Sequence, residues 1–409
     1  MAPNHPLAAD PDAGFGLYVH WPYCDRICPY CDFNVRRTRA IDAAEWRAAF
    51  RAEMGHLRSM QGDAAPALTS LYFGGGTPSL MPPALIAGVI DDAAKTWGFI
   101  DGAEITVEAN PTSSEIARFA AFQGAGVNRL SLGIQSLDDA ALNFLGRDHS
   151  AAEARDGLGR AAEVFGRTTF DLIYGRPNQT LAAWTDELHT ALAFAAGHVS
   201  LYQLTIEDGT AFAAAQRRGT LVQPEESALA DLYEATQEIM AAAGLSAYEV
   251  SNHAGQTEQG RHNLTYWRYG AYAGIGPGAH GRLVIDDRRV ATETIRDPEA
   301  WRAAALNTGH GISHQTELDA EACSDEMLVT GLRLAEGVPA ARFLAVTGFS
   351  LAQLHTAPRV GTLREQELIS LDEDRLTATT RGRGLLNAVI AEIATDLSWL
   401  VDQTTPAPD

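Results

Sequence analysis

Basic residues are scarce in this chain of 409 residues, and so are cysteines. The 31 Lys and Arg residues are outnumbered by 52 Asp and Glu residues, which gives a formal net charge of −21. A chain of this charge lacks the clustered basic surface that nucleic-acid binding requires, so no nucleic-acid partner is expected. The 4 cysteines are too few for a disulfide scaffold in a chain of this length, which favours a reducing compartment.

Long apolar runs are also missing. No stretch of about 18 or more apolar residues occurs, and residues 1–14 contain no basic segment followed by an apolar one. A membrane-spanning helix and a secretory signal are therefore not expected, and we expect a cytoplasmic protein. With 46% hydrophobic and 20% charged residues, the composition is that of a folded protein.

The first two-thirds of the sequence alternates strand-like and helix-like segments. Strands are expected at residues 17–21, 70–73, 104–109, 129–135, 168–174 and 198–206, and each is followed by a segment with a helical pattern. Six such units in a row indicate parallel strands joined by helical crossovers. They predict an α/β fold with a partial (β/α)6 barrel, and an open doubly wound sheet is the alternative. In either fold, the catalytic and ligand-binding residues lie at the carboxyl ends of the strands.

The pattern changes after about residue 245, where Gly, Tyr and His become frequent. We expect a flexible N-terminus at 1–14, the barrel at 15–282, a connector with some strand at 283–317, a smaller domain at 318–400 and a tail at 401–409. The smaller domain is predicted to be mainly helical and winged-helix-like. Winged helices often bind DNA, but only Arg381 and Arg383 offer basic charge here, so DNA binding is not expected.

Three cysteines, Cys24, Cys28 and Cys31, follow the first predicted strand. Their C-x3-C-x2-C spacing lets three thiolates hold three irons of a cubane iron–sulfur cluster. The fourth iron would then be free to bind a chelating small molecule. Zinc is the alternative, with His20 or Cys323 as a fourth ligand, since structural zinc sites prefer four closed ligands. A purely structural group of thiols is a third interpretation.

This spacing, together with the glycine-rich segment GGGTP at residues 74–78, resembles the radical S-adenosylmethionine (SAM) superfamily. In that superfamily the open iron is chelated by SAM, and one electron from the cluster cleaves the sulfonium. The resemblance implies a [4Fe-4S] cluster on the three cysteines and a SAM site at the strand ends. The implied SAM-site residues are Tyr18 and Tyr30 beside the cluster, Gly75, Gly76 and Thr77 at the methionine part, Glu108 at the ribose, Gln135, Arg147 and Asp171 as further contacts, and Leu204 and Ile275 near the adenine.

Several of these residues have an ordinary alternative role. A triple glycine is also a plain turn, Glu108 is also an acid at the start of a helix, and Arg147 is also a partner for a surface salt bridge. Their positions after successive predicted strands are what favour the SAM site.

The whole chain resembles the branch of the superfamily that contains the anaerobic coproporphyrinogen III dehydrogenases (HemN) and the HemW heme chaperones. The resemblance runs from Tyr18 to about Leu397, includes a HemN-type C-terminal domain, and rests on EANPT, GVNRLSLGIQS, LGRDH and DLIYG. Arg176 departs from the branch, which usually has an apolar residue there. The dehydrogenases have a further cysteine where this chain has Phe33, and a longer segment before the cluster loop than the 17 residues that precede Tyr18.

The segment HNLTYW at residues 262–267 matches a motif of the heme chaperones. The resemblance implies heme contacts at His262, Tyr266 and Trp267, since a neutral imidazole is a good axial ligand and aromatic rings offer flat apolar surface. His262 and Tyr266 share one face if the segment is helical. The alternative is that the segment packs at the barrel rim with His262 hydrogen-bonded internally. The other histidine candidates are weaker: His20, His253 and His280.

Together these features favour a radical SAM-type heme chaperone that holds one [4Fe-4S] cluster, binds SAM and heme, and passes heme to an acceptor protein. The expected partners are heme, acceptor proteins of the respiratory or membrane-associated kind, and an electron donor such as flavodoxin. The alternative is oxidative decarboxylation of coproporphyrinogen III, an enzyme activity that Phe33 argues against. A zinc-stabilised interaction protein is the third interpretation. Whether SAM is cleaved or only bound stays open at this point.

Overall fold

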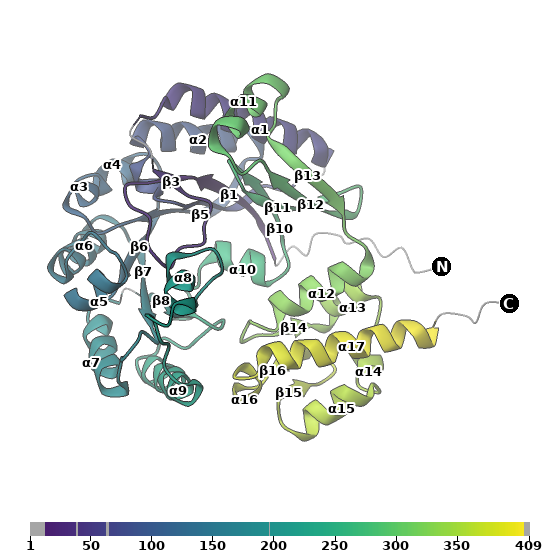
Figure 1. The fold of residues 1–409 in the computed structure, drawn as a ribbon. Helices are drawn as coiled ribbons and strands as arrows, with labels where there is room; N and C mark the ends of the chain where they lie inside the picture. Colours follow the sequence, from purple (N-terminus) through teal and green to yellow (C-terminus); the bar gives the residue numbers. More distant parts are fainter. Residues whose placement is uncertain (1–12, 38–39, 63–64, 196, 405–409) are drawn as a thin grey trace.

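A partial barrel of parallel strands forms the larger part of the molecule (Figure 1). The computed structural model describes residues 13–37, 40–62, 65–195 and 197–404. The six strands of the predicted units are β1 (Phe15–Trp21), β4 (Leu68–Gly75), β5 (Phe99–Ala109), β6 (Arg129–Gln135), β7 (Arg167–Tyr174) and β8 (His198–Gln203). They lie next to one another in chain order and pair in parallel. A doubly wound sheet would reverse its strand order part-way, so the barrel prediction is confirmed.

Helices cover the outside of the barrel (Figure 1). Several of them begin at a capping side chain, and α1 and α6 are two examples. Asp42 accepts a hydrogen bond from Ala44 N, and Ser150 forms a capping box with Glu153. The principal helices of the barrel are α1 (Ala43–Gln61), α2 (Pro83–Thr96), α3 (Ser113–Ile116), α4 (Phe119–Gly124), α5 (Asp139–Phe144), α6 (Ala151–Val164), α7 (Leu181–Leu192) and α9 (Glu226–Ala242).

Successive side chains of a strand point to opposite faces of the sheet. One face packs against the helices in the apolar core, and the other faces the inside of the barrel. In β1, Leu17 and Trp21 are fully buried against the helices, and the ring centroid of Trp21 lies 4.9 Å from that of Trp46 in α1. The side chains of Tyr18 and His20 leave the opposite face of the strand, toward the inside. The barrel therefore has an aromatic and polar interior, and its continuous apolar core lies between sheet and helices.

Five more strands extend the sheet to 11 strands. Residues 283–317, predicted as a connector with some strand, contain strands that complete one edge of this sheet. α11 (Pro298–Thr308) packs on α1, where Trp301 stacks on Trp46 with ring centroids 5.4 Å apart. The edge strands are partly exposed and lack the apolar runs of the barrel strands, so their sequence pattern is weak. The added strands are β10 (Ala271–Ile275), parallel to β1, β9 (Asn252–Ala254), antiparallel to β8, and the antiparallel series β11 (His280–Ile285), β12 (Arg288–Thr294) and β13 (Ile312–Glu317).

A separate, mainly helical unit lies beside the barrel (Figure 1). It has its own apolar core, in which Met327, Phe343, Leu376 and Ile393 are fully buried. Helices with a small antiparallel sheet match the winged-helix-like prediction. The helices are α12 (Ala320–Gly331), α13 (Ala340–Thr347), α14 (Leu351–Leu354), α15 (Pro358–Glu365), α16 (Thr380–Arg383) and α17 (Leu386–Thr404), and the strands, in sheet order, are β14 (Val338–Pro339), β16 (Arg375–Ala378) and β15 (Ile369–Leu371).

Most of the predicted flexible segment 1–14, and the end of the predicted tail 401–409, lie outside the described residues. α17 continues into the predicted tail as far as Thr404. Among the helices in the described part of the chain, none is long and apolar enough to cross a membrane.

Gly274 allows β10 and β11 to approach each other closely. A Cβ at this position would overlap the carbonyl oxygen of His280, whereas a Cβ at Gly55, in α1, would meet open space. We expect Gly274→Ala to lower the free energy of unfolding by about 2 kcal/mol through overpacking. Gly55→Ala should instead raise it by roughly 0.5–1 kcal/mol, because alanine favours the helix. Urea-induced unfolding measures both changes, and a Gly274→Ala variant as stable as the parent would contradict the prediction.

Candidate functional site

The three-cysteine loop lies at the carboxyl ends of the barrel strands. Cys24 sits in a two-residue strand, β2 (Tyr23–Cys24), which pairs with β3 (Arg36–Arg37). Within the loop, Cys31 N donates a hydrogen bond to Cys28 O at 3.2 Å. Pro29 O accepts a hydrogen bond at 2.9 Å from Phe212 N, in α8 (Ala211–Arg217). The three thiols are free and line one cavity of about 640 Å³, so the structure brings the trio together.

Burial sets the protonation of these thiols. It raises the pKa of Cys24 to about 11, and it also raises the pKa of Cys31. Both sulfurs are therefore thiols at neutral pH until a positive centre, such as cluster iron, favours the thiolate.

The glycine-rich segment after β4 lies against the cysteine loop. Gly76 N donates a hydrogen bond to Trp21 O at 2.7 Å, and Thr77 N donates one to Tyr23 O at 2.9 Å. Gly75 has a φ of 105°, in the region that favours glycine. A Cβ on Gly76 would lie 2.7 Å from the carbonyl oxygen of Tyr23, so no larger residue fits there. Gly75, Gly76 and Thr77 all line the cavity beside the thiols.

Two acidic side chains, Glu108 of β5 and Asp171 of β7, line the same cavity. Burial raises the pKa of Glu108 to about 7, although Tyr72 donates a hydrogen bond to this carboxylate at 2.8 Å and opposes the rise. The negative charge of Asp171 raises it further. Burial likewise raises the pKa of Asp171 to about 6. Two desolvated carboxyl groups at one cavity are suited to accept hydrogen bonds from the hydroxyl groups of a ligand.

Arg147 connects the cavity wall with the cysteine loop. Its Nη1 lies 3.5 Å from Cys28 Sγ, and its Nη2 donates hydrogen bonds to Gly133 O at 2.8 Å and to Asn110 Oδ1. Its buried Nε makes no hydrogen bond to any residue that the structure describes. A guanidinium that lines a cavity and retains an unused donor is suited to an anionic ligand group.

Gln135, the last residue of β6, and Arg176, in the loop after β7, lie at the same end of the barrel. Gln135 lines the cavity with a φ of 67°, and its buried Oε1 has no partner within the described residues. Arg176 donates a hydrogen bond from Nη1 to Ser136 Oγ at 2.6 Å and pairs with Glu187 of α7. Arg176 stands where the HemN and HemW branch usually has an apolar residue, and these contacts give it a structural role. Its guanidinium links the loop after β7 to the loop after β6.

Sequence reasoning missed four residues of this site: Tyr72, Asn110, Ser136 and Glu187. A signal exists for two of them. Tyr72 alternates with Gly74 on the inner face of β4, and Asn110 belongs to the EANP segment at the end of β5. Ser136 and Glu187 matter only through Arg176, a contact that requires the fold.

The other predicted SAM-site residues lie in three places. Tyr30 and Leu204 line the main cavity. Tyr18 instead lines a second cavity of about 320 Å³. Ile275 is fully buried in the apolar core, and its predicted contact with adenine stays a prediction. Its side chain leaves the outer face of β10, because Gly274 occupies the alternating inner position.

The HNLTYW segment forms a helix, α10 (Arg261–Trp267), close to the amino ends of β1 and β4. His262 is 2% exposed, and its Nδ1 and Nε2 lie 2.9 Å from Ser70 Oγ and 2.8 Å from Tyr266 Oη. Burial lowers the pKa of His262 to about 3, so the ring is neutral. This is the alternative in which His262 is hydrogen-bonded internally, and an axial heme role is not supported. The guanidinium carbon of Arg333 lies over the ring of Trp267, 4.7 Å from the ring centroid. The side chains of the HNLTYW segment therefore do not form one common surface for a ligand.

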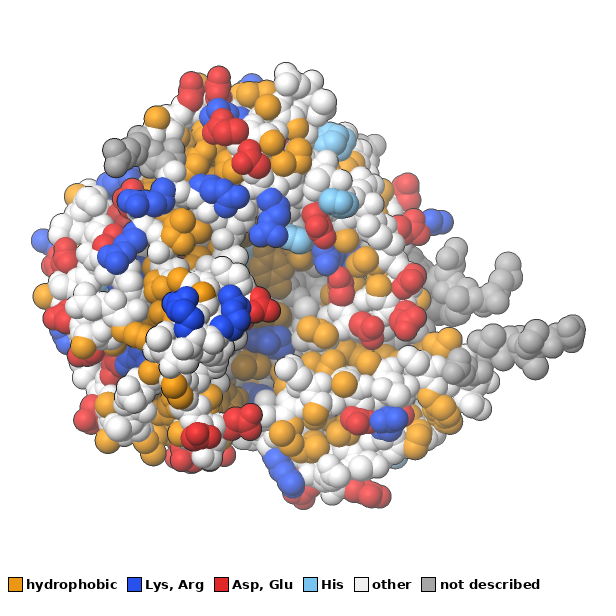
Figure 2. Space-filling view, in the orientation of Figure 1, with side chains coloured by type: hydrophobic (Ala, Val, Ile, Leu, Met, Phe, Trp, Pro, Cys, Tyr) orange, Lys and Arg blue, Asp and Glu red, His pale blue; other side chains and the backbone are white. Residues whose placement is uncertain are grey.

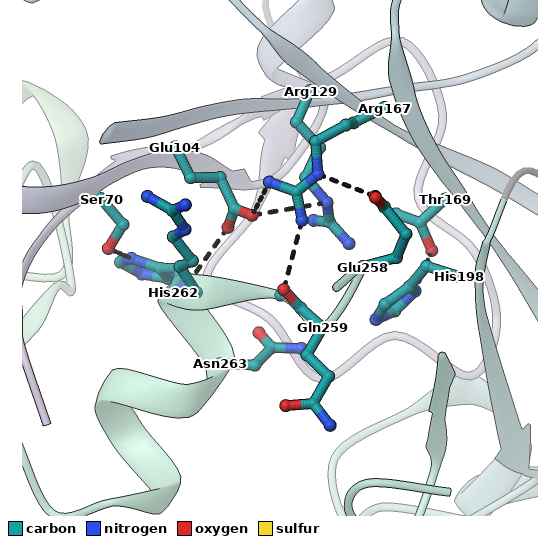
Figure 3. A network of polar contacts seen from close by, with 12 residues as sticks. Ser70, Glu104, Arg129, Arg167, Thr169, His198, Glu258, Gln259, His262 and Asn263 are labelled. Atoms are coloured by element: carbon teal, nitrogen blue, oxygen red, sulfur yellow. Dashed lines mark hydrogen bonds and ion pairs between the residues drawn. The ribbon is translucent and has the colours of Figure 1, made fainter. Parts of the chain in front are cut away.

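A buried charge network holds α10 against the barrel (Figure 3). Glu104 of β5 accepts a hydrogen bond from His262 N at 3.2 Å. The same carboxylate lies 2.9 Å from Arg167 Nη1 and 3.8 Å from Arg129 Nε. Arg167 also pairs at 2.9 Å with the less buried Glu258. Burial by itself would raise the pKa of Glu104, but the two arginines outweigh it and hold that pKa below its usual range.

Comparison with known proteins places the chain in a family. Residues 18–191 match the radical SAM superfamily, and residues 318–385 match the HemN C-terminal domain. The mitochondrial radical S-adenosyl methionine domain-containing protein 1 of Bos taurus is 37% identical over 398 residues, which cover 96% of this chain and 90% of the relative. The chain belongs to the radical SAM superfamily.

Bacterial members of the superfamily that are named heme chaperone HemW match nearly end to end. The Haemophilus influenzae protein is 35% identical, covering 93% of this chain and 98% of the relative. The Escherichia coli protein is 34% identical, and the match covers 91% of this chain and 96% of the relative. The solved structure of Escherichia coli coproporphyrinogen III oxidase (HemN) has a TM-score of 0.76 at 21% identity, covering 96% of this chain and 92% of that one. The predicted HemN-like branch, close to HemW, is confirmed, and the structural likeness shows the fold.

Radical SAM proteins use a [4Fe-4S] cluster and SAM, and the main cavity fits both. Within the described residues, no three Cys, His, Asp or Glu side chains converge on one point as a lone metal ion requires. A cube of iron and sulfur instead takes each cysteine at a separate corner. The tight glycine backbone and the unused polar atoms of Gln135 and Arg147 leave room and partners for SAM. In radical SAM proteins, the cluster and SAM bound together supply one-electron cleavage of the sulfonium.

The charge network makes a stability prediction. Glu104→Ala leaves Arg129 and Arg167 without their shared carboxylate, so we expect the free energy of unfolding to fall by about 3–5 kcal/mol. Glu258→Ala is the matched control, because it removes the less buried end of the same network and should cost about 1 kcal/mol or less. Urea-induced unfolding measures both variants, and equal losses would contradict the account.

The raised pKa of Glu108 makes a pH prediction. An acid whose pKa rises to about 7 on folding takes up a proton between its ordinary pKa and that value. The free energy of unfolding therefore falls as pH rises through this window. Glu108→Gln removes the effect and keeps an acceptor for Tyr72. Without cofactors, the variant should be about 2 kcal/mol more stable than the parent at about pH 8 and nearly equal to it at about pH 5. Denaturant unfolding at both pH values measures this, and a difference that does not change with pH would be the contrary result.

Proposed function

We propose that this chain is a heme chaperone that holds one [4Fe-4S] cluster, binds SAM, carries heme and passes the heme to an acceptor protein. The observation that carries the proposal is the nearly full-length similarity to proteins named heme chaperone HemW. The three cysteines at one cavity support the cluster. Phe33, at the position where the dehydrogenases have a further cysteine, supports a chaperone over that enzyme.

In this proposal Cys24, Cys28 and Cys31 hold the cluster, and the rest of the main cavity holds SAM. The acids face the ribose hydroxyls, the arginine and glutamine face the charged methionine part, and the glycines allow the backbone to approach it. The proposed SAM-site residues are Tyr30, Gly75, Gly76, Thr77, Glu108, Gln135, Arg147, Asp171 and Leu204.

The proposed partners are heme, acceptor proteins of the respiratory or membrane-associated kind, and an electron donor such as flavodoxin. Arg26, Arg36 and Arg37 are exposed on the cysteine loop and beside it. They offer a basic surface to an acidic electron donor, despite the negative charge of the whole chain.

We also propose a division into two functional parts, with the cofactors in the barrel and a HemN-type domain that begins near residue 318. The cytoplasm is the proposed location, because a thiol-held cluster requires reducing conditions.

Heme transfer by anaerobically reconstituted protein tests the proposal. We expect the parent to contain iron and sulfide for one cluster, to show a Soret band with hemin, and to pass heme to the heme-free form of a respiratory heme protein. Cys24→Ser, Cys28→Ser and Cys31→Ser should each lose the cluster. Cys323→Ser should keep it, because this cysteine is buried in the C-terminal unit.

Three results would contradict the proposal. One is a parent protein that binds no hemin. Another is formation of protoporphyrinogen from coproporphyrinogen III with SAM and a reductant, which would establish the dehydrogenase. The third is zinc in place of iron and sulfide after anaerobic purification, which would favour the interaction protein.

A further inference from the structure

A second cavity lies beside the main one, between β1, β10 and α10. Its volume is about 320 Å³, and Tyr18, Tyr266 and Tyr272 are among its lining residues. Phe33 lines both cavities and is 62% exposed, so the two spaces meet at this ring. Figure 2 shows a hollow in this face of the molecule, near the places of β10 and α10 in Figure 1.

The walls of this cavity are aromatic and held in place. Tyr266 and Tyr272 meet edge to face, with ring centroids 4.4 Å apart. The hydroxyl of Tyr266 is fixed by its 2.8 Å hydrogen bond with His262. The HNLTYW motif therefore reaches the cavity through Tyr266, and the buried His262 acts as a positioning residue for it. Fixed aromatic rings suit a flat apolar ligand.

His280, at the start of β11, is an accessible nitrogen donor of this cavity. Its side chain is 58% exposed, and its Nδ1 lies 3.9 Å from Glu293 Oε1. No described residue makes a hydrogen bond to its Nε2. A carboxylate near Nδ1 favours the tautomer in which Nε2 carries a lone pair for a metal. His20, in the same cavity, is 5% exposed, and both of its ring nitrogens are hydrogen-bonded.

Arg296 provides positive charge at the same cavity. Its backbone oxygen accepts a hydrogen bond from Asn34 Nδ2 at 2.7 Å, and its side chain is exposed. Burial lowers the pKa of His20, and the charges of His280 and Arg296 lower it further, so both side chains lie near the ring. Within the described residues, the guanidinium forms no ion pair. It is therefore suited to a carboxylate of the ligand.

We infer that heme binds in this second cavity, with His280 Nε2 on the iron, Arg296 paired with a propionate, and Phe33 and Tyr272 against the macrocycle. The inference rests on the proposed function and specifies where the heme binds. The flat macrocycle of heme suits the aromatic walls of the cavity. A heme propionate suits the guanidinium of Arg296, and an open coordination position on the iron suits the imidazole of His280. A cavity of about 320 Å³ covers only part of such a ligand and leaves an edge for an acceptor protein.

Hemin titration of the reconstituted holoprotein tests this site. We expect His280→Ala to bind hemin about 10-fold more weakly and to shift the Soret band, because the iron loses its ligand. Arg296→Gln should weaken binding by about 5-fold without moving the band, because only a charge pair is lost. His189→Ala, an exposed histidine on α7, is the matched control and should behave like the parent.

Metal-free protoporphyrin separates the ligand role from packing. Phe33→Ala should weaken its binding, whereas His280→Ala should not, because this probe has no iron to ligate. If the parent binds hemin and the His280, Arg296 and Phe33 variants match it in affinity and spectrum, the inference is overturned and the proposed function stands. If the parent binds no hemin, both are overturned.

Discussion

Three unpaired thiols at one end of a barrel are the constraint on which the rest of this molecule depends. Their loop must be held firmly, because a cluster with one open corner is useful only when that corner faces a prepared pocket. Backbone hydrogen bonds supply this support, from Gly76 N to Trp21 O and from Phe212 N to Pro29 O. The glycines keep the backbone close, and successive strand ends supply the acids and the arginine around the pocket.

The opposite end of the barrel carries a second constraint, which is the burial of charge. Glu104 between Arg129 and Arg167 fixes the start of α10, and α10 then places the ring of His262 inside the barrel. That ring holds Tyr266 at the wall of the second cavity. In our account the HNLTYW segment contributes Tyr266 to the wall of the heme site. The iron ligand, His280, comes from β11.

Much of the barrel could be predicted from the sequence, because buried parallel strands appear as apolar runs followed by helices. The six predicted strands coincide with β1 and with β4 to β8. The edge strands at 283–317 could be predicted only as some strand within a connector, since their partial exposure weakens the apolar signal. The face of Ile275 depends on the register of β10 against β1, where it lies opposite Val19. The environment of His262 depends on Ser70, which is far away in sequence, so its motif alone could not reveal that both ring nitrogens are occupied.

The central claim is that the cluster keeps one iron open for SAM. The most direct measurement is electron–nuclear double resonance on the reduced, reconstituted holoprotein with SAM that is isotopically labelled in its amino and carboxylate groups. The account predicts hyperfine coupling between the cluster and both labelled groups. A protein that carries a complete reduced cluster but shows no coupling to either group would contradict it.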